Sequence, residues 1–182
     1  NHRELPLTIF APSGLKKILQ VHFDVTGSEL CFPVNFVDIT PVNGKVIFEN
    51  DFLEVSTVEM IHRLPCCGFV FKEKNRDRNI IPEKIEEHNI PYTEIPNIKK
   101  GADFVTKGGK VIKNAAITKA PPKPRKYAFC TDTAYNDAII PYIKGVDLLY
   151  HEATFSKAQK ERAKETYHST SVQAALIAKK AN

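Results

Sequence analysis

The chain has 182 residues, of which 42% are hydrophobic, and a formal net charge of +5. This length suits one domain, or one domain with an appendage, and no apolar run approaches the ~20 residues that a membrane span needs. The sequence begins at Asn1 rather than at methionine, and no charged-then-apolar leader opens it. We therefore expect a piece of a longer protein that is not bound to a membrane.

The four cysteines give no sign of a disulfide framework or of a metal finger. Cys31, Cys66, Cys67 and Cys130 lie in apolar or adjacent positions, without the paired spacing of a finger. Such usage is typical of reduced thiols, which predicts an intracellular, cytoplasmic protein.

Several strands and one helix are predicted in the first third of the chain. Leu7–Phe10 is predicted as a strand, followed by a turn and a helix from Leu15 to about Phe23. Alternating apolar residues predict a strand from Pro33 to Ile39. Asn43-Gly44 is a strong turn signal, so we expect a hairpin between this strand and Val46–Phe48.

A second hairpin is predicted to end at a histidine. The strand-like run from Phe52 to Ile61 changes its apolar phase near Ser56-Thr57, which indicates a bulge or a strand buried on both faces. We expect it to pair with Gly68–Phe71, so that His62 closes one strand. A terminal histidine of this kind is more often a hydrogen-bonded residue than a ligand.

The composition changes between Lys72 and Lys126. This segment has 14 Lys and Arg against 7 Asp and Glu, and it contains six of the 12 prolines. A short helix is predicted from Glu83 to His88 and a hairpin turn at Lys107–Lys110. A segment of this length suits a projecting arm rather than a loop. Its surplus of positive charge is typical either of a solvated surface or of a site for a phosphate backbone.

Three polar groups are set into apolar segments between Tyr127 and Asn182. The run Tyr127–Cys130 leads to Asp132, the run Asp147–Tyr150 leads to His151 and Glu152, and His168 precedes a helix predicted at Ser171–Ala181. This helix is apolar over most of its circumference and is predicted to be buried, with Thr170 and Gln173 forming a capping box.

The order of these segments predicts an α/β fold in which the polar residues meet at one edge of a sheet. Ligands of such folds gather where strands end, so Asp132, His151, Glu152 and His168 are candidates for a shared site. A carboxylate and imidazoles suit a metal ion or acid–base chemistry.

The sequence resembles the ribonuclease Z family of tRNA 3′-processing endonucleases, which have the metallo-β-lactamase fold. The matching segments are Phe129–Thr133, Val146–Phe155 and Tyr167–Thr170, together with Leu7–Leu15 and Val58–Phe71 further upstream. The resemblance implies a partial metallo-β-lactamase-like αββα sandwich, formed by residues 1–71 and 127–182, with residues 72–126 inserted as a basic tRNA-binding arm.

The same resemblance implies roles for single residues. His62 is similar to a metal ligand of the family, and Asp132 to the carboxylate that bridges two zinc ions. His168 is similar to the histidine that handles protons, and Glu152 to the residue that orients it. The arm residues expected to contact precursor tRNA are Lys99, Lys100, Lys107, Lys110 and Lys113. The family also implies a homodimer in which one subunit's arm serves the other's active site.

The family's upstream His-x-His-x-Asp-His segment and its late histidine are not in this sequence. With only two of the metal ligands, the 182-residue chain is expected to be inactive by itself. Ala11 and Asn89–Thr93 also differ from the family pattern at a turn and at the arm's tip. Two alternatives stay open: a hydrolase of the same fold that acts on a small phosphodiester or ester, and a non-catalytic RNA-binding fragment.

Overall fold

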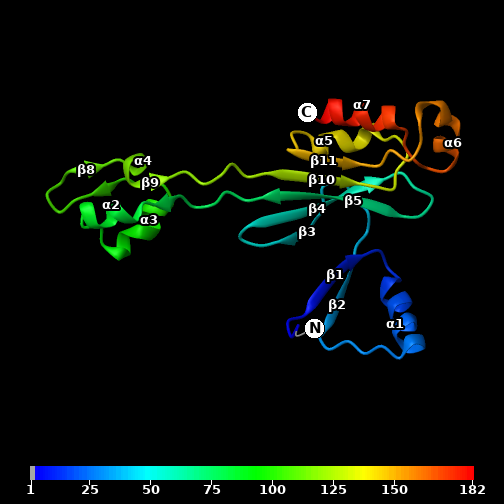
Figure 1. Cartoon of the computed structure of the whole chain (residues 1–182), viewed down its shortest axis with the longest axis horizontal. Helices are drawn as coiled ribbons and strands as arrows, with labels where there is room; N and C mark the ends of the chain where they lie inside the picture. The colour runs from blue at the N-terminus through cyan, green and yellow to red at the C-terminus, as the bar shows by residue number, and fades with distance from the viewer. Residues whose placement is uncertain (1–2) are drawn as a thin grey trace. The chain divides into compact units, whose positions relative to one another are not determined.

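The computed structural model describes residues 3–182, which form two compact units. The first unit contains the chain up to Lys72 together with Arg125–Asn182, and the second contains Glu73–Pro124. Each unit combines strands and helices (Figure 1). Within residues 3–182, no helix has the length and apolar character that crossing a bilayer requires.

A five-stranded sheet forms the centre of the first unit. Its strands lie in the order β11-β10-β5-β4-β3. β10 pairs in parallel with β11 and antiparallel with β5, and β3 pairs antiparallel with β4. The strands are β3 (Val46–Glu49), β4 (Leu53–Met60), β5 (Cys66–Glu73), β10 (Lys126–Cys130) and β11 (Leu148–His151).

The expected change of phase along β4 is confirmed. Val46 pairs with Ser56 and Phe48 with Val55, so β3 carries an extra residue at this point. On β4 the neighbouring residues Thr57 and Val58 are both buried. This strand is therefore covered on both faces at the position where its apolar pattern changes.

The helical elements after β10 are η2 (Asp137–Ile139), α5 (Ile140–Ile143), η3 (Lys157–Gln159), α6 (Lys160–Glu165) and α7 (Ser171–Ala181). Of these, α5 and α7 lie along the sheet (Figure 1), and η2 contacts β4. Val58, Val70 and Ala128 of the sheet join Ile143 of α5 and Ile177 of α7 in one buried cluster.

Cys67 and Cys130 lie inside the first unit as well. Burial raises the pKa of the Cys67 thiol to about 11 and that of Cys130 to about 12. Both thiols therefore stay protonated at neutral pH and behave as small apolar side chains.

The prediction that α7 is buried all round is wrong. Only Ile177 and Ala181 are buried on it, whereas Val172 and Leu176 are each 42% exposed. The helix packs against α5 and the sheet along one side, and its small alanines do not need to be covered. Its predicted start is confirmed, because Thr170 and Gln173 form the capping box.

The N-terminal segment contains β1 (Leu7–Ala11), α1 (Leu15–Thr26) and β2 (Val34–Asp38). β1 and β2 pair with each other in parallel, so the predicted hairpin between β2 and β3 is wrong. The Asn43-Gly44 turn exists, but it is held against β4: Thr57 O accepts from Gly44 N–H, and Asn43 Oδ1 accepts from Glu59 N–H. These bonds hold the turn against β4, which lies further along the chain, rather than in a hairpin of β2 with β3.

The second unit has several short elements and a core of its own. They are β6 (Asn79–Ile80), α2 (Pro82–Glu87), η1 (Tyr92–Glu94), α3 (Ile95–Lys99), β7 (Phe104–Val105), β8 (Val111–Ile112), α4 (Asn114–Ile117) and β9 (Thr118–Lys119). The predicted α2 and the β7–β8 hairpin are confirmed. The core consists of Ile90, Ile98, Phe104, Ile112 and Ile117, a cluster that we did not predict.

Candidate functional site

Four of the predicted site residues lie in loops next to strands or to a helix start. His62 follows β4, Asp132 follows β10 and Glu152 follows β11, while His168 lies two residues before the N-cap of α7. Because β10 and β11 run in parallel, their carboxyl ends deliver Asp132 and Glu152 to the same edge of the sheet. The predicted shared edge is therefore present in the structure for these two carboxylates.

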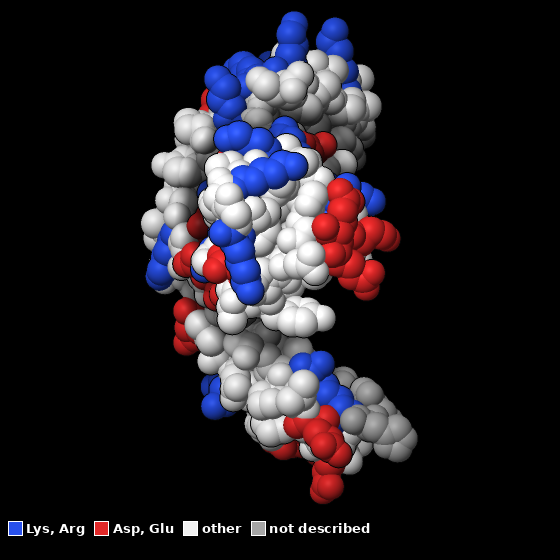
Figure 2. Space-filling view, turned by 90° about the vertical axis from the view of Figure 1, so that its left-hand side faces the viewer, with Lys and Arg blue, Asp and Glu red and all other residues white. Residues whose placement is uncertain are grey.

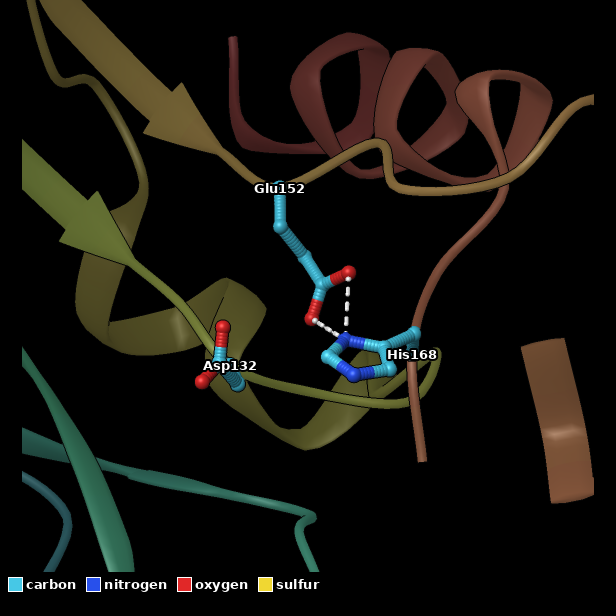
Figure 3. Close-up of side chains that lie close together, drawn as sticks. All are labelled: Asp132, Glu152 and His168. Atoms are coloured by element: carbon cyan, nitrogen blue, oxygen red, sulfur yellow. Dashed lines mark hydrogen bonds and ion pairs between the residues drawn. The ribbon is translucent and has the colours of Figure 1, made fainter. Parts of the chain in front are cut away.

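Asp132, Glu152 and His168 come together at this edge (Figure 3). One ligand atom from each residue lies within 4.8 Å of the others. His62 is outside this group, although its ring centroid is 5.8 Å from that of His168. His151 is also outside it; its Nδ1 lies 2.8 Å from the backbone oxygen of Glu152, and its buried Nε2 has no partner among the described residues.

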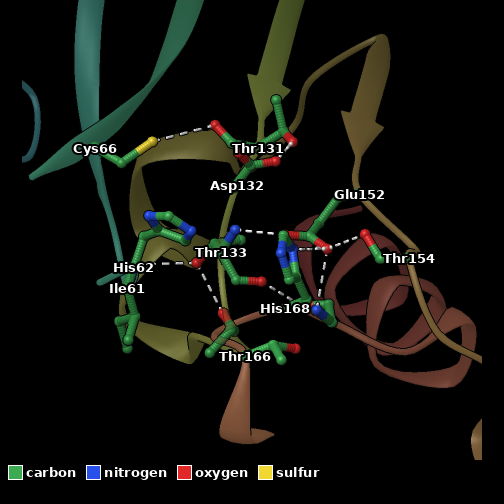
Figure 4. Close-up of polar contacts among 12 residues, drawn as sticks. Ile61, His62, Cys66, Thr131, Asp132, Thr133, Glu152, Thr154, Thr166 and His168 are labelled. Carbon is green, nitrogen blue, oxygen red and sulfur yellow. Dashed lines mark hydrogen bonds and ion pairs between the residues drawn. The ribbon is translucent and has the colours of Figure 1, made fainter. Parts of the chain in front are cut away.

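Glu152 is buried and accepts hydrogen bonds from four donors (Figure 4). Oε1 accepts from the backbone N–H of Thr133, and Oε2 accepts from the Thr154 hydroxyl and from the backbone N–H of Ser169. His168 Nδ1 lies 3.0 Å from Oε1 and 3.1 Å from Oε2. With all of its acceptor directions in use, this carboxylate has little capacity left to bind a metal ion.

These contacts keep Glu152 ionised. Burial alone would raise the pKa of its carboxyl, but the hydrogen bonds from Thr133, Thr154, Ser169 and His168 together hold that pKa below its usual value. An ionised carboxylate only accepts hydrogen bonds, so His168 must carry a proton on Nδ1. Its Nε2 is then the nitrogen that can take up or release a proton.

Asp132 differs from Glu152 in its surroundings. It is exposed, and its one hydrogen bond among the described side chains comes from the Thr131 hydroxyl to Oδ1, at 2.9 Å. Oδ2 stays available, which suits a metal ligand better than the saturated Glu152 does. His62 accepts a long bond of 3.4 Å at Nδ1 from Leu64 N–H, within its own loop.

Thr133 and Ser169 connect the segments that carry His62, Asp132 and His168. The sequence did not predict a role for either residue. Both are fully buried. The Thr133 hydroxyl accepts from Ile61 N–H at 3.0 Å, and the Ser169 hydroxyl donates to Thr133 O at 2.8 Å. These bonds join the loop that carries His62, the loop that carries Asp132 and the segment that carries His168. Small hydroxyl residues beside acidic or histidine residues were the only signal in the sequence.

The five predicted arm lysines all lie in the second unit. Lys113 forms an ion pair with Asp103, at 2.9 Å. Within residues 3–182, Lys99, Lys100, Lys107 and Lys110 form no ion pair with an acidic side chain. The unit also exposes Glu83, Glu86, Glu87 and Glu94 on or beside α2 and η1. In the space-filling view, the largest group of acidic side chains lies at the right, smaller acidic groups lie at the left edge and near the bottom, and basic side chains are spread between them and above (Figure 2).

Comparison with known proteins identifies relatives along nearly the whole chain. The ribonuclease Z of Parabacteroides distasonis is 43% identical over 175 residues, covering 96% of this chain and 58% of the relative. That of Bacteroides fragilis is 41% identical over 176 residues, covering 97% and 58%. That of Porphyromonas gingivalis is 37% identical over 175 residues, covering 96% and 58%. No family model matches the sequence.

Two solved structures share the fold. The short form of human tRNase Z has a TM-score of 0.63 at 22% identity, covering 97% of this chain and 56% of that structure. The metallo-β-lactamase fold protein YhfI from Bacillus subtilis has a TM-score of 0.52 at 14% identity, covering 97% and 48%. The predicted fold class is thus confirmed. The chain spans a little more than half the length of the curated relatives named above, and its predicted relationship to ribonuclease Z is confirmed over nearly all of its residues.

Proposed function

We propose that this chain is part of a zinc-dependent endoribonuclease that removes the 3′ trailer from precursor tRNA. The observation that carries the proposal is the Glu152–His168 pair beside an available Asp132 carboxylate, in a chain related to ribonuclease Z. Hydrolysis of a phosphodiester needs a proton for the leaving oxygen, and a histidine held in one tautomer provides it.

His168 acts through Nε2 in this proposal. Glu152 fixes the proton on Nδ1, because its carboxylate stays ionised and only accepts hydrogen bonds. The protonated ring then donates from Nε2 to the ribose 3′ oxygen as the phosphorus–oxygen bond breaks. Thr133 and Ser169 support this step indirectly, since they fix where Glu152 and the His168 loop lie.

Asp132 and His62 are the residues that would hold metal. Their donor atoms, a carboxylate oxygen and an imidazole nitrogen, fit zinc, and the free Oδ2 of Asp132 suits a ligand position. Bound zinc ions supply activation of water and neutralisation of the charge that builds up on the phosphate. Two protein ligands do not complete a tetrahedral shell, so further ligands come from outside this chain in our proposal.

The second unit serves as the RNA-binding arm in this proposal, with Lys99, Lys100, Lys107 and Lys110 directed to phosphates. Support comes from their charge and from the lack of acidic partners for them among the described residues. We further propose a cytoplasmic homodimer in which each arm serves the partner's site.

The test uses the full-length protein that contains this chain. We expect purified protein loaded with zinc to cleave a precursor tRNA at the start of its trailer. Asp132→Ala should remove both metal binding and cleavage. His168→Ala should keep metal and tRNA affinity while lowering turnover by about 10²-fold or more.

The results separate the alternatives named above. Cleavage of a small phosphodiester without cleavage of precursor tRNA would favour the small-substrate hydrolase. Binding of tRNA without any metal or turnover would favour the non-catalytic fragment. Loss of metal from His168→Ala would contradict the role given to His168, because that residue is not a ligand in this proposal.

A further inference from the structure

A small pocket lies against His168, and most of the polar side chains in its partly apolar lining can donate hydrogen bonds. Its volume is about 230 Å³, and its lining includes Lys160 and Lys164 of α6, Gln173 of α7 and the side chain of Tyr135. Asp132 and His62, the candidate metal ligands, are not part of the lining. All of these residues belong to the first unit.

Lys160 and Lys164 are one helical turn apart on α6, and both are exposed. Residues four apart lie on the same face of a helix, so the two ammonium groups reach the same space. Within residues 3–182 neither lysine forms an ion pair. Glu161 is the one acidic residue in the lining and does not balance both charges.

Gln173 and Tyr135 are held in fixed positions at this pocket. The Gln173 Oε1 atom accepts from Thr170 N–H at 2.9 Å, which leaves its Nε2 group as a donor without a partner among the described residues. The Tyr135 hydroxyl donates to Asp137 at 2.8 Å and accepts from Lys180 at 3.0 Å. Tyr135 therefore contributes ring surface rather than an acceptor.

We propose that this pocket binds one backbone phosphate of the RNA substrate, the phosphate immediately 5′ of the nucleotide whose 3′ oxygen leaves. The pocket offers two ammonium groups and an amide N–H₂ as donors, and Glu161 is its one free side-chain acceptor. This set of groups suits an anion with several acceptor oxygens. The volume admits a phosphate with part of its ribose and excludes a folded stem.

The position of the phosphate follows from the role of His168. This inference rests on the proposed function, in which His168 Nε2 gives a proton to the leaving 3′ oxygen. The nucleotide that carries this oxygen then lies beside His168, and its own 5′ phosphate extends into the adjoining pocket. Lys160 and Lys164 are thus positioning residues for the strand on the mature side of the cut.

A double-mutant cycle between protein and RNA tests this assignment. The complete enzyme is compared with Lys160→Ala/Lys164→Ala, on a precursor tRNA and on the same precursor with a neutral methylphosphonate at that one linkage. Wild-type kcat/KM should fall about 10-fold on the neutral linkage. The kcat/KM of the double variant on the normal precursor should be lower than that of wild type by about 10-fold or more. The neutral linkage should not lower the kcat/KM of the double variant any further. The loss should be in KM, because the contact exists before and during cleavage.

Lys157→Ala/Lys179→Ala is the matched control, since it removes two exposed lysines outside the pocket. It should respond to the methylphosphonate as wild type does, with circular dichroism showing that all variants are folded. An equal effect of the neutral linkage on wild type and on the Lys160/Lys164 variant would overturn the pocket assignment alone. A wild-type enzyme that does not cleave the precursor at all would instead overturn the proposed function.

Discussion

Glu152 shows how a single buried carboxylate can fix a site that is assembled from three loops. Its donors come from the loop after β10, from its own loop and from the segment before α7. The sequence predicted that Asp132, Glu152 and His168 share an edge, because each one follows a strand or precedes a helix cap. It did not predict Thr133 and Ser169 as anchors, because bonds between residues 36 positions apart leave no periodic signal.

We predict that Glu152→Gln destabilises the fold although it keeps the size of the side chain. The amide N–H₂ group replaces an oxygen that accepts from donors, so the buried backbone N–H of either Thr133 or Ser169 loses its acceptor and faces another donor. The free energy of unfolding should fall by about 3 kcal/mol. Urea denaturation followed by far-UV circular dichroism measures this change.

Thr154→Ala is the comparison for this prediction, because it removes one hydrogen bond from Glu152 at an exposed residue and leaves the carboxylate in place. This substitution should lower the free energy of unfolding by about 1 kcal/mol. Equal costs for the two variants would show that the loops do not depend on the charge of Glu152.

At the scale of elements, two of the predicted strand pairings are present, whereas the predicted hairpin between β2 and β3 is not. The β4–β5 neighbours and the β7–β8 hairpin are present as predicted. The parallel pairing of β1 with β2, and of β10 with β11, was not predicted. An alternating pattern reports that a strand has two different faces, but it does not identify the partner, which is chosen by contacts such as those of Thr57 with the Asn43-Gly44 turn.

The contact between β5 and β10 depends on Gly68. A Cβ atom at this position would lie 2.5 Å from the backbone oxygen of Phe129, and backbone atoms cannot move aside as a flexible side chain can. We therefore predict that Gly68→Ala lowers the free energy of unfolding by about 2 kcal/mol or more, by separating β5 from β10, the strand that precedes Asp132. The same denaturation measurement applies.

Gly108→Ala is the matched control for this substitution. A Cβ atom there meets only Thr106 Oγ1, at 4.0 Å, and Gly108 is not in the left-handed region. Its free energy of unfolding should stay within about 0.5 kcal/mol of wild type. A loss in Gly108→Ala as large as that in Gly68→Ala would mean that the methyl clash with Phe129 is not the cause.

At the scale of the whole molecule, the second unit is organised around its own apolar core. Ile98 and Ile117 are almost completely buried, and Asn114 donates to Ile98 O and Ala102 O inside the unit. Composition predicted a basic, proline-rich excursion but not this core, because the contributing isoleucines are scattered among polar residues without a regular period. Within this basic unit, four exposed glutamates gather on or beside α2 and η1.

The arm can be removed near the place where the chain enters and leaves the second unit. β6 and β9 pair at Asn79 and Lys119, so a short Gly/Ser linker can replace Arg76–Lys119 in the complete enzyme. We predict that this deletion weakens precursor-tRNA binding sharply and flattens the slope of log affinity against log salt, because fewer phosphate contacts release fewer counterions. Hydrolysis of a nitrophenyl phosphodiester should survive, since Asp132, Glu152 and His168 all belong to the first unit.

A charge-only variant separates the arm's lysines from its bulk. Lys100→Gln/Lys107→Gln/Lys110→Gln leaves the core of the second unit intact and omits Lys113, whose partner is Asp103. If the arm acts through phosphate contacts, the slope of log affinity against log salt should become shallower by about 2 to 3 in this variant, at ~0.7–0.9 for each of three contacts. Its rate on the nitrophenyl substrate should equal that of wild type. Unchanged tRNA affinity in both variants would make the arm a solvated surface, whereas loss of both activities on deletion would make it part of the enzyme's fold.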